Sequence, residues 1–357
     1  MRNFVSDARH NRGMPSQVDA SGFEVGENLA VTPGSVVYRD EVMEVIQYAP
    51  ATAQVQARPV VLIPPQINKY YFLDLAPGRS FIEYAVSRGL QFFGISWRNP
   101  GKKQGDWGLD TYAEAFLRAV DVARDVTGSD DVNALGMCAG GITMTTALSH
   151  LAATHDPRVH SAAFGVTLLD FSVPSMVGLF RSRPLLSVAR RRSAGARVLD
   201  GDSLASVFTW MRPNDLVWNY WVNNYLMGKK PPAFDILAWN ADKTNLPGRL
   251  HGQFLEIFEH NVLVKPGGLT VLGSPVDLAA IKFDTYVTGG LTDHLTPWQG
   301  CYRATQLFSG PALITFAGQR SRRKGVITSR QMGSAFTWLR PDDLVFNYWV
   351  NNYLLGD

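Results

Sequence analysis

The 357-residue sequence contains only two cysteines, Cys138 and Cys301. Two thiols cannot build the framework of several disulfides that holds small secreted domains together, and so few cysteines favour a reducing compartment. No apolar run approaches the roughly 18 residues that a membrane-spanning helix needs. Residues 1–7 also lack the apolar core of a signal peptide. The sequence therefore predicts a cytoplasmic protein without a transmembrane segment.

The chain also has little excess charge. Its 34 Lys and Arg against 31 Asp and Glu leave a formal net charge of +3, which is too small to indicate nucleic acid binding. Hydrophobic residues make up 46% of the sequence and charged residues 18%. At this length, we expect one large globular domain with insertions.

What the sequence does contain is a glycine-rich turn, Gly136-Met137-Cys138-Ala139-Gly140-Gly141. The pattern predicts a buried strand before it, at residues 131–135, and a helix after it, at residues 142–151. A strand, a Gly-x-nucleophile-x-Gly turn and a helix form the nucleophile elbow of α/β-hydrolases, here with Cys138 in place of serine. Glycine is needed at 136 and 140 because a Cβ there would collide with the closely passing backbone.

The position of Cys138 in this turn predicts the pKa of its thiol. The start of a helix favours a thiolate, so we expect the pKa of Cys138 to lie below the roughly 8.5 of a free thiol. Taken alone, these residues also fit an inert buried cysteine in a glycine-rich turn between a strand and a helix. The two interpretations differ in the reactivity that they predict for Cys138.

Strands and helices alternate around this turn. Residues 59–63 form a continuous apolar run that is typical of a strand covered on both faces. Further strands are expected at 42–48, 91–96, 161–169, 284–290 and 312–316, and helices at 80–88 and 109–126. This alternation predicts the α/β-hydrolase fold, a mostly parallel sheet with helices on both faces.

The loop that follows the apolar run, residues 64–69, has a second predicted role. In an α/β-hydrolase this loop supplies one N–H group of the oxyanion hole, and the residue after the nucleophile supplies the other. Gln66 or Ile67 is therefore the candidate partner of the Ala139 N–H group. An ordinary turn between a strand and a helix is the alternative.

The chain divides into three regions. Residues 1–40 are polar, are interrupted by glycine and proline, and are expected to form an irregular strap on a larger body. Residues 41–318 form the catalytic domain. Within it, residues from about 173 to 265 lose the alternation and carry aromatic residues at helical spacing, a pattern typical of core or interface. Because this segment lies between two core strands, we interpret it as a cap. Residues 319–357 form the third region.

Several stretches, taken together, match the motifs of one known family. They are TPGSVVY at 32–38, PPQINKYY at 64–71, SWRNP at 96–100, GMCAGG at 136–141, LLDF at 168–171, RPNDLVWNY at 212–220, WNAD at 239–242, TNLP at 244–247 and DHLTPW at 293–298. Over roughly residues 10–318 the chain resembles polyhydroxyalkanoate synthases, including poly-3-hydroxybutyrate synthases of class I and II. These bacterial acyltransferases polymerise 3-hydroxyacyl-CoA into storage polyester.

The resemblance implies roles for three residues. Cys138 would be the nucleophile that carries the growing acyl chain as a thioester, a group that exchanges readily with coenzyme A. Asp293 occupies the position of the catalytic carboxylate, just past a strand. His294 beside it is expected to shape that turn rather than to act as the general base. The substrate itself supplies coenzyme A, and no further cofactor or metal is implied.

The general-base histidine is where the sequence departs from the family. The family places it in a Gly-His segment shortly after the last strand, but no histidine follows His294. Instead, residues 333–356 repeat residues 205–228, with 18 of 24 positions identical. The repeat is either an extra docking element or a junction that has replaced the family's C-terminus. The family's longer N-terminal region is also largely absent.

Three functions therefore remain open. The first is an acyltransferase that makes polyhydroxyalkanoate through a Cys138 thioester and is impaired by the missing histidine. The second is a hydrolase or thioesterase on the same fold, and the third is a catalytically inactive scaffold that binds partners or polymer granules. The resemblance further implies a homodimer formed through the cap and a cytoplasmic location on polyester granules.

Overall fold

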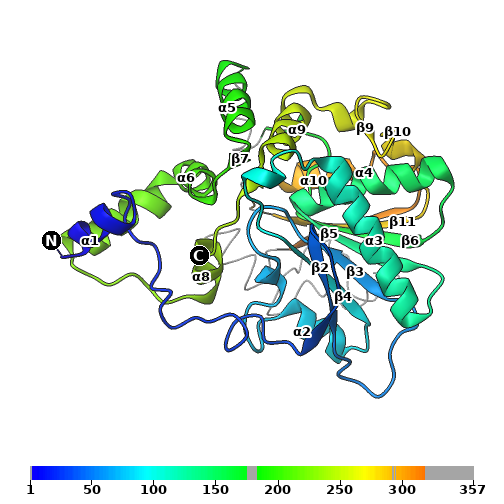
Figure 1. The fold of residues 1–357 in the computed structure, drawn as a ribbon, viewed down its shortest axis with the longest axis horizontal. Coiled ribbons are helices and arrows are strands. Elements are labelled where there is room, and N and C mark those ends of the chain that lie inside the picture. Colours follow the sequence, from blue (N-terminus) through cyan, green and yellow to red (C-terminus); the bar gives the residue numbers. More distant parts are fainter. Residues whose placement is uncertain (1, 175–182, 292, 294, 318–357) are drawn as a thin grey trace.

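The computed structural model describes residues 2–174, 183–291, 293 and 295–317 of the chain. Its centre is an eight-stranded sheet with the strand order β1-β2-β4-β3-β5-β6-β11-β12 (Figure 1). The strands from β4 to β12 pair in parallel, whereas β2 is antiparallel to both β1 and β4. They are β1 (Gly34–Arg39), β2 (Met43–Tyr48), β3 (Val60–Ile63), β4 (Phe92–Trp97), β5 (Val132–Met137), β6 (Val159–Gly165), β11 (Asp284–Gly290) and β12 (Ala312–Ala317). The predicted mostly parallel sheet is confirmed.

The register of the central strands brings their carboxyl ends together. Ile63 of β3 lies opposite Gly136 of β5, and Met137 lies opposite Gly165 of β6. Gly165 in turn pairs with Thr288 of β11. Because ligands bind outside the carboxyl ends of strands in open α/β sheets, this edge is where a functional site is expected.

Helices cover both faces of the sheet, which accounts for the continuous apolar strands. The larger core lies under α3 (Leu109–Thr127), α4 (Ala139–Thr154), α9 (Gly248–His260) and α10 (Trp298–Ala304). The opposite core lies under η1 (Tyr70–Leu73), α2 (Phe81–Ser87) and α8 (Asp235–Ala241). All four residues of β3 are buried between these layers. This confirms the prediction that the apolar run at 59–63 forms a strand covered on both faces.

Helix α3 shows how the sequence directs this packing. Its apolar residues Leu109, Tyr112, Phe116 and Val120 recur at intervals of three or four and are all buried. The helix ends at Gly128, whose φ of 69° lies in the left-handed region that glycine adopts without a steric penalty. The predicted helix at 109–126 is therefore confirmed to within a residue.

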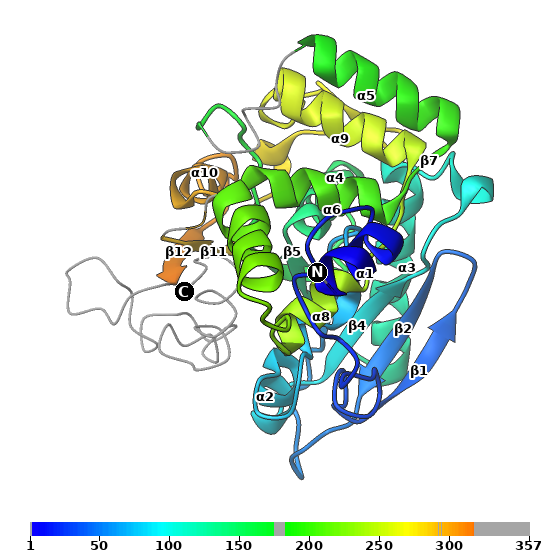
Figure 2. The same ribbon diagram turned by 90° about the vertical axis from the view of Figure 1, so that its left-hand side faces the viewer.

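The cap segment contains a series of helical elements. They are α5 (Arg183–Ala196), α6 (Gly201–Met211), η4 (Asn214–Trp218), α7 (Asn219–Trp221) and η5 (Val222–Leu226), followed by α8. Figure 2 shows α5 lying against α9, while α6 extends beside the N-terminal helix. Two short strands, β7 (Val198–Leu199) and β8 (Leu246–Pro247), pair with each other at the base of this segment.

The N-terminal segment is more regular than expected. We expected an irregular strap at 1–40, but the structure contains helix α1 (Arg2–His10) and strand β1. The helix packs on η5, where the Phe4 and Tyr225 rings meet edge to face at 5.3 Å. The Tyr225 hydroxyl donates a hydrogen bond of 2.8 Å to the buried Asp7 carboxylate. These apolar and hydrogen-bonded contacts order a segment whose composition alone suggested a loop.

The remaining described elements are short. They are η2 (Lys102–Gln104), η6 (Val262–Val264), η7 (Leu278–Ala280) and the hairpin formed by β9 (Thr270–Val271) and β10 (Ser274–Pro275). Among the helices that the structure describes, none combines the length and the hydropathy that a bilayer crossing requires. The predicted third region, residues 319–357 with the repeat, lies outside the described residues.

Candidate active site

The turn around Cys138 has the backbone geometry of a nucleophile elbow. Cys138 follows β5 directly and precedes α4, with a φ of 51° and a ψ of −122°. A positive φ is strained for a residue with a side chain, so the surroundings must hold it in place. The Cys138 N–H group donates to the Gly165 carbonyl at 3.0 Å, and its carbonyl accepts from Gly141 at the same distance. The predicted strand, strained turn and helix are therefore confirmed.

Three glycines allow this turn to pass close to its neighbours. A Cβ on Gly136 would lie 2.7 Å from the Gly141 Cα atom, and one on Gly140 would lie 2.4 Å from the Ile63 carbonyl oxygen. A Cβ on Gly141 would lie 2.2 Å from the Thr167 hydroxyl. The crowding expected at 136 and 140 is confirmed, and Gly141 adds a third position of this kind.

The Cys138 thiol does not have the low pKa that we expected. The side chain is exposed, but protein atoms surround the sulfur, and desolvation raises its pKa to about 11. The hydrogen bond from the Ala139 N–H group acts in the opposite direction, and the negative charge of Asp293 adds to the increase. The prediction was wrong because desolvation and a nearby carboxylate outweigh the helix terminus.

Asp293 lies shortly after β11, at the same edge of the sheet. Its side chain is buried, and one carboxylate oxygen accepts hydrogen bonds from the Leu295 and Thr296 N–H groups at 2.8 and 3.0 Å. The Thr296 hydroxyl donates to the other oxygen. These bonds fix the carboxylate in a position where its charge acts on Cys138. His294, predicted to shape this turn, lies outside the described residues.

The second cysteine lies beneath the same edge. Cys301 of α10 is fully buried, and its thiol donates to the Thr296 carbonyl at 3.6 Å. Burial raises the pKa of Cys301 strongly, and the charges of Asp293 and Cys138 contribute to the increase. Cys301 is therefore a neutral part of the core rather than a reactive thiol.

The six described histidines do not supply a base to this site. None is hydrogen-bonded to Cys138 or Asp293, and five have polar contacts elsewhere, with Ser6 (His10), Ser274 (His150), Asp131 (His160), Ser193 (His251) and Glu259 (His260). Desolvation, followed by the charge of Arg190, lowers the pKa of His251 to about 4. Within the described residues, the structure therefore offers no histidine in the place of the family's general base.

The 64–69 loop lies against the first turn of α4, as an oxyanion loop would. Gln66 is buried and donates through Nε2 to the Thr143 hydroxyl at 3.1 Å, while Ile67 is half-buried. The Thr143 hydroxyl donates in turn to the Ala139 carbonyl at 3.3 Å. Sequence reasoning missed Thr143, although its position one helical turn after Ala139 was a usable signal.

Thr167 is a second residue that sequence reasoning missed. Its hydroxyl lies 2.9 Å from the Gly165 carbonyl and 3.4 Å from the Cys138 carbonyl, so it contacts the backbone on both sides of the elbow. No motif in the sequence marks it. Across the described ranges, no group of three or more His, Cys, Asp or Glu side chains is arranged to hold a metal ion.

Two family models match overlapping parts of the chain. Residues 1–85 match the family described as the N-terminus of poly-beta-hydroxybutyrate polymerase (PhaC), and residues 59–319 match the α/β-hydrolase fold family. A soluble variant of monoglyceride lipase from Saccharomyces cerevisiae has a similar structure, with a TM-score of 0.50 and 10% identity over 82% of this chain and 88% of the lipase. This likeness supports the fold alone.

Two curated relatives are much more similar in sequence. Poly(3-hydroxyalkanoate) polymerase 1 of Ectopseudomonas oleovorans is 50% identical over 87% of this chain and 56% of its own length. The poly(3-hydroxyalkanoate) polymerase subunit PhaC of Cupriavidus necator is 43% identical over 87% of this chain and 53% of its own length. The chain thus spans little more than half the length of these relatives.

Proposed function

Because this chain belongs to the α/β-hydrolase fold family and is a relative of the poly(3-hydroxyalkanoate) polymerases, we propose that it is an acyltransferase that polymerises 3-hydroxyacyl-CoA. The observation that carries the proposal is the strained elbow at Cys138 beside the buried Asp293 carboxylate. A lipase-like elbow with cysteine suits transfer between thioesters, because the acyl group can be taken from one thiol and passed on.

The proposed reaction has two steps. The Cys138 sulfur attacks the thioester carbonyl carbon, a new carbon–sulfur bond forms, and the bond to coenzyme A breaks. The proton leaves the Cys138 thiol and ends on the released coenzyme A thiol. In the second step the 3-hydroxyl oxygen of another acyl unit attacks the carbonyl carbon of the Cys138 thioester, an ester bond forms, the carbon–sulfur bond to Cys138 breaks, and the hydroxyl proton ends on the restored Cys138 thiol.

Both steps pass through a tetrahedral intermediate with a negative oxygen. We propose that the Ala139 N–H group and an N–H group of Gln66 or Ile67 stabilise this oxygen. The contact of the 64–69 loop with the first turn of α4 supports the assignment. Removing one such donor costs on the order of 10²–10³ in rate in well-studied hydrolases. Asp293 would orient the general base and stabilise its protonated form.

The proposal also covers the domain organisation, the cofactor, the oligomeric state and the location of the enzyme. Residues 1–40 would act as a strap on the cap, residues 41–318 as the catalytic domain with the cap at about 173–265, and residues 319–357 as an added C-terminal region. The substrate would supply the coenzyme A, with no other cofactor. A homodimer formed through the cap and a cytoplasmic site on polyester granules complete the proposal, since exposed aromatic residues line the cap.

The proposal is tested by incubating the purified chain with 3-hydroxybutyryl-CoA while following coenzyme A release and insoluble polymer. Polymer together with coenzyme A, abolished by Cys138→Ala, is the expected result. Coenzyme A with free 3-hydroxybutyrate would instead identify a thioesterase. A chain that releases neither product would be an inactive scaffold, and the proposed function would be wrong.

A further inference from the structure

The 64–69 loop is held at both ends by indole N–H groups from two different parts of the fold. Trp97, at the end of β4, donates to the Pro64 carbonyl at 3.0 Å. Trp239, on α8, donates to the Lys69 carbonyl at 2.9 Å. The first bond ties the loop to the sheet, whereas the second ties it to α8, which lies within the cap segment.

Helix α8 and Asp242, the residue that follows it, make further contacts beyond the end of the loop. The Tyr71 hydroxyl donates to the Asp242 carboxylate at 2.9 Å, and the Lys69 ammonium lies 3.8 Å from the same carboxylate. The Trp239 ring packs on Phe72, with ring centroids 5.7 Å apart. Burial and the charge of Asp242 raise the pKa of Tyr71, so the phenol remains a proton donor.

The loop needs such support because its backbone is not relaxed. Asn68 has a φ of 66°, in the left-handed region, and its side-chain amide is 3.5 Å from the Asn240 oxygen on α8. Residues 67–69 are only half-buried, whereas residues 64–66 are buried. The half of the loop that contains Ile67 therefore depends on α8 more than on the core.

We propose that Trp239 and Asp242 are positioning residues for acyl transfer, which hold the 64–69 loop so that its N–H group faces the oxygen of the tetrahedral intermediate. The inference rests on the proposed function and adds to it a part for the WNAD stretch at 239–242. A displacement of about 1 Å in a catalytic group can cost about 10² in rate, so these contacts matter although neither residue touches the substrate.

The same contacts connect the loop to the cap. Within the cap segment, α8 follows η5, and the stretch between them is bound by the N-terminal strap, where the Asp19 N–H group donates to the Pro232 carbonyl at 2.9 Å. Asp235, the first residue of α8, pairs with Arg79 at 2.7 Å. A shift of the cap would therefore move α8 and, through it, the donor side of the oxyanion hole.

The proposal is tested first by the rate of acyl-enzyme formation on Cys138 with 3-hydroxybutyryl-CoA. Trp239→Phe keeps the ring on Phe72 but removes the N–H donor, and we expect the maximal rate to fall about tenfold or more while KM changes less than about twofold. Asp242→Ala should lower the maximal rate in the same way. Asp242→Asn, which still accepts from Tyr71, should restore most of it.

The control is Tyr84→Phe, another change that leaves an aromatic ring in place and removes a hydrogen-bond donor. Tyr84 is half-buried on α2, where the Arg88 guanidinium lies 5.0 Å from its ring centroid. This variant should leave both the maximal rate and KM unchanged. An equal loss of rate in Tyr84→Phe and Trp239→Phe, or a rise in KM alone, would overturn the positioning role.

Amide hydrogen exchange gives a readout that does not need activity. In Trp239→Phe we expect exchange in residues 66–69 to quicken about fivefold, the effect of one lost hydrogen bond of about 1 kcal/mol, with α4 unchanged. Unchanged exchange in the loop would overturn the proposal. If the wild-type chain forms no acyl-enzyme, the proposed function fails, and the positioning role is then decided by the exchange measurement alone.

Discussion

At the scale of single residues, the chemistry of Cys138 depends on whether its neighbours stabilise or destabilise the thiolate. Desolvation and Asp293 disfavour the thiolate, and the single hydrogen bond from Ala139 favours it. Cys138 is thus exposed at the surface, but its thiol is mostly protonated at neutral pH. Reaction with an acyl-CoA would require the proton to be removed as the carbon–sulfur bond forms.

This balance predicts the alkylation behaviour of Cys138. With a pKa of about 11, its thiolate fraction rises about tenfold per pH unit up to that value. Iodoacetamide should therefore label it at pH 7 about 300-fold more slowly than a free thiol with a pKa of about 8.5. The fully buried Cys301 should remain unlabelled in the folded protein. Mass spectrometry over a pH series measures both rates, and labelling of Cys138 at pH 7 as fast as that of a free cysteine would contradict the prediction.

Asp293 supplies a second prediction at this scale. Asp293→Asn keeps an oxygen that can accept from the Leu295 and Thr296 N–H groups but removes the charge that raises the pKa of Cys138. Alkylation of Cys138 at pH 8 should therefore become faster, by a few-fold.

The effect of the same substitution on acyl transfer tests the missing base. An intact triad loses about 10⁴ in rate when its carboxylate is replaced. Because no described histidine contacts Asp293, we expect Asp293→Asn to reduce residual acyl transfer by about tenfold or less. A loss near 10⁴ would mean that a histidine serves as base after all. His251→Gln and His260→Gln would then be the next variants to assay.

At the scale of secondary structure elements, the elbow depends on the close approach of α4 to β3. A Cβ on Gly140 would lie 2.4–2.6 Å from backbone atoms of Ile63 and Pro64, which cannot rotate away as a side chain can. Gly140→Ala should lower the free energy of unfolding by about 3 kcal/mol. Gly195→Ala on α5, where nothing lies within 4 Å, is the control and should leave the free energy unchanged or raise it by up to about 1 kcal/mol. Urea denaturation compares the two, and equal stability would contradict the account of the elbow.

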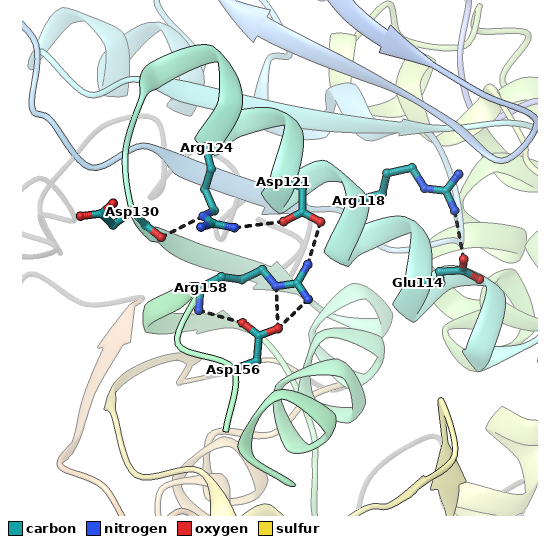
Figure 3. Close-up of polar contacts among 7 residues, drawn as sticks. All are labelled: Glu114, Arg118, Asp121, Arg124, Asp130, Asp156 and Arg158. Carbon is teal, nitrogen blue, oxygen red and sulfur yellow. Dashed lines mark hydrogen bonds and ion pairs between the residues drawn. The ribbon is translucent and has the colours of Figure 1, made fainter. Parts of the chain in front are cut away.

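An ion-pair network joins α3 to the segment between α4 and β6 (Figure 3). Arg158 contacts Asp156 at 2.6 Å and Asp121 of α3 at 2.7 Å, and Arg124 also contacts Asp121. The hydrogen bond from Arg158 is the main cause that lowers the pKa of Asp156. Because the folded-state pKa is the lower one, this stabilisation is present above the unfolded pKa of about 4 and is lost as the pH falls through the folded value.

We therefore expect a pH-dependent effect of Arg158→Leu. The substitution should lower the free energy of unfolding by about 1–2 kcal/mol at pH 7 and by less at pH 2.5, because Asp156 takes up its proton as the pH falls through its lowered pKa. Arg39→Leu, whose contact with Glu44 is a surface pair on the edge strands β1 and β2, should cost less than about 1 kcal/mol at either pH. Urea titrations at both pH values provide the measurement, and a loss for Arg158→Leu that is independent of pH would rule out the ion pairs as its cause.

At the scale of the whole molecule, the described part of the cap presents an exposed apolar surface around η5. Leu226 is 66% exposed, Met227 60% and Trp218 50%. Exposed apolar groups that lie close together indicate an association surface. This exposed surface agrees with the proposed homodimer.

The proposed dimer predicts a concentration-dependent mass in sedimentation equilibrium, rising from 39.4 kDa toward twice that value. Leu226→Lys and Met227→Lys together should weaken the association by about tenfold or more, because a charge would be buried in the interface. Val188→Lys on α5, which is 63% exposed, is the control and should change nothing. A monomer at all concentrations would contradict the dimer.

Much of this fold could be predicted because its signals are local. The apolar run of β3, the period of α3 and the glycines beside Cys138 each follow from the residues within one element. Helix α1 and strand β1 were missed, because α1 is polar and owes its order to contacts with Tyr225 and other residues more than two hundred positions away. Tertiary contacts of this kind leave no periodic pattern in the sequence.

The sequence by itself determined the type of fold, the elbow at Cys138 and the place of Asp293 after a strand, because each depends on short-range spacing and on the presence or absence of a Cβ. Only the tertiary structure decided the state of the thiol and the support of the 64–69 loop. The pKa of Cys138 depends on how much water the folded chain displaces and on a carboxylate 155 positions away in sequence, 293 − 138. The tie from Trp239 to Lys69 likewise joins two motifs that only the folded chain brings within 2.9 Å.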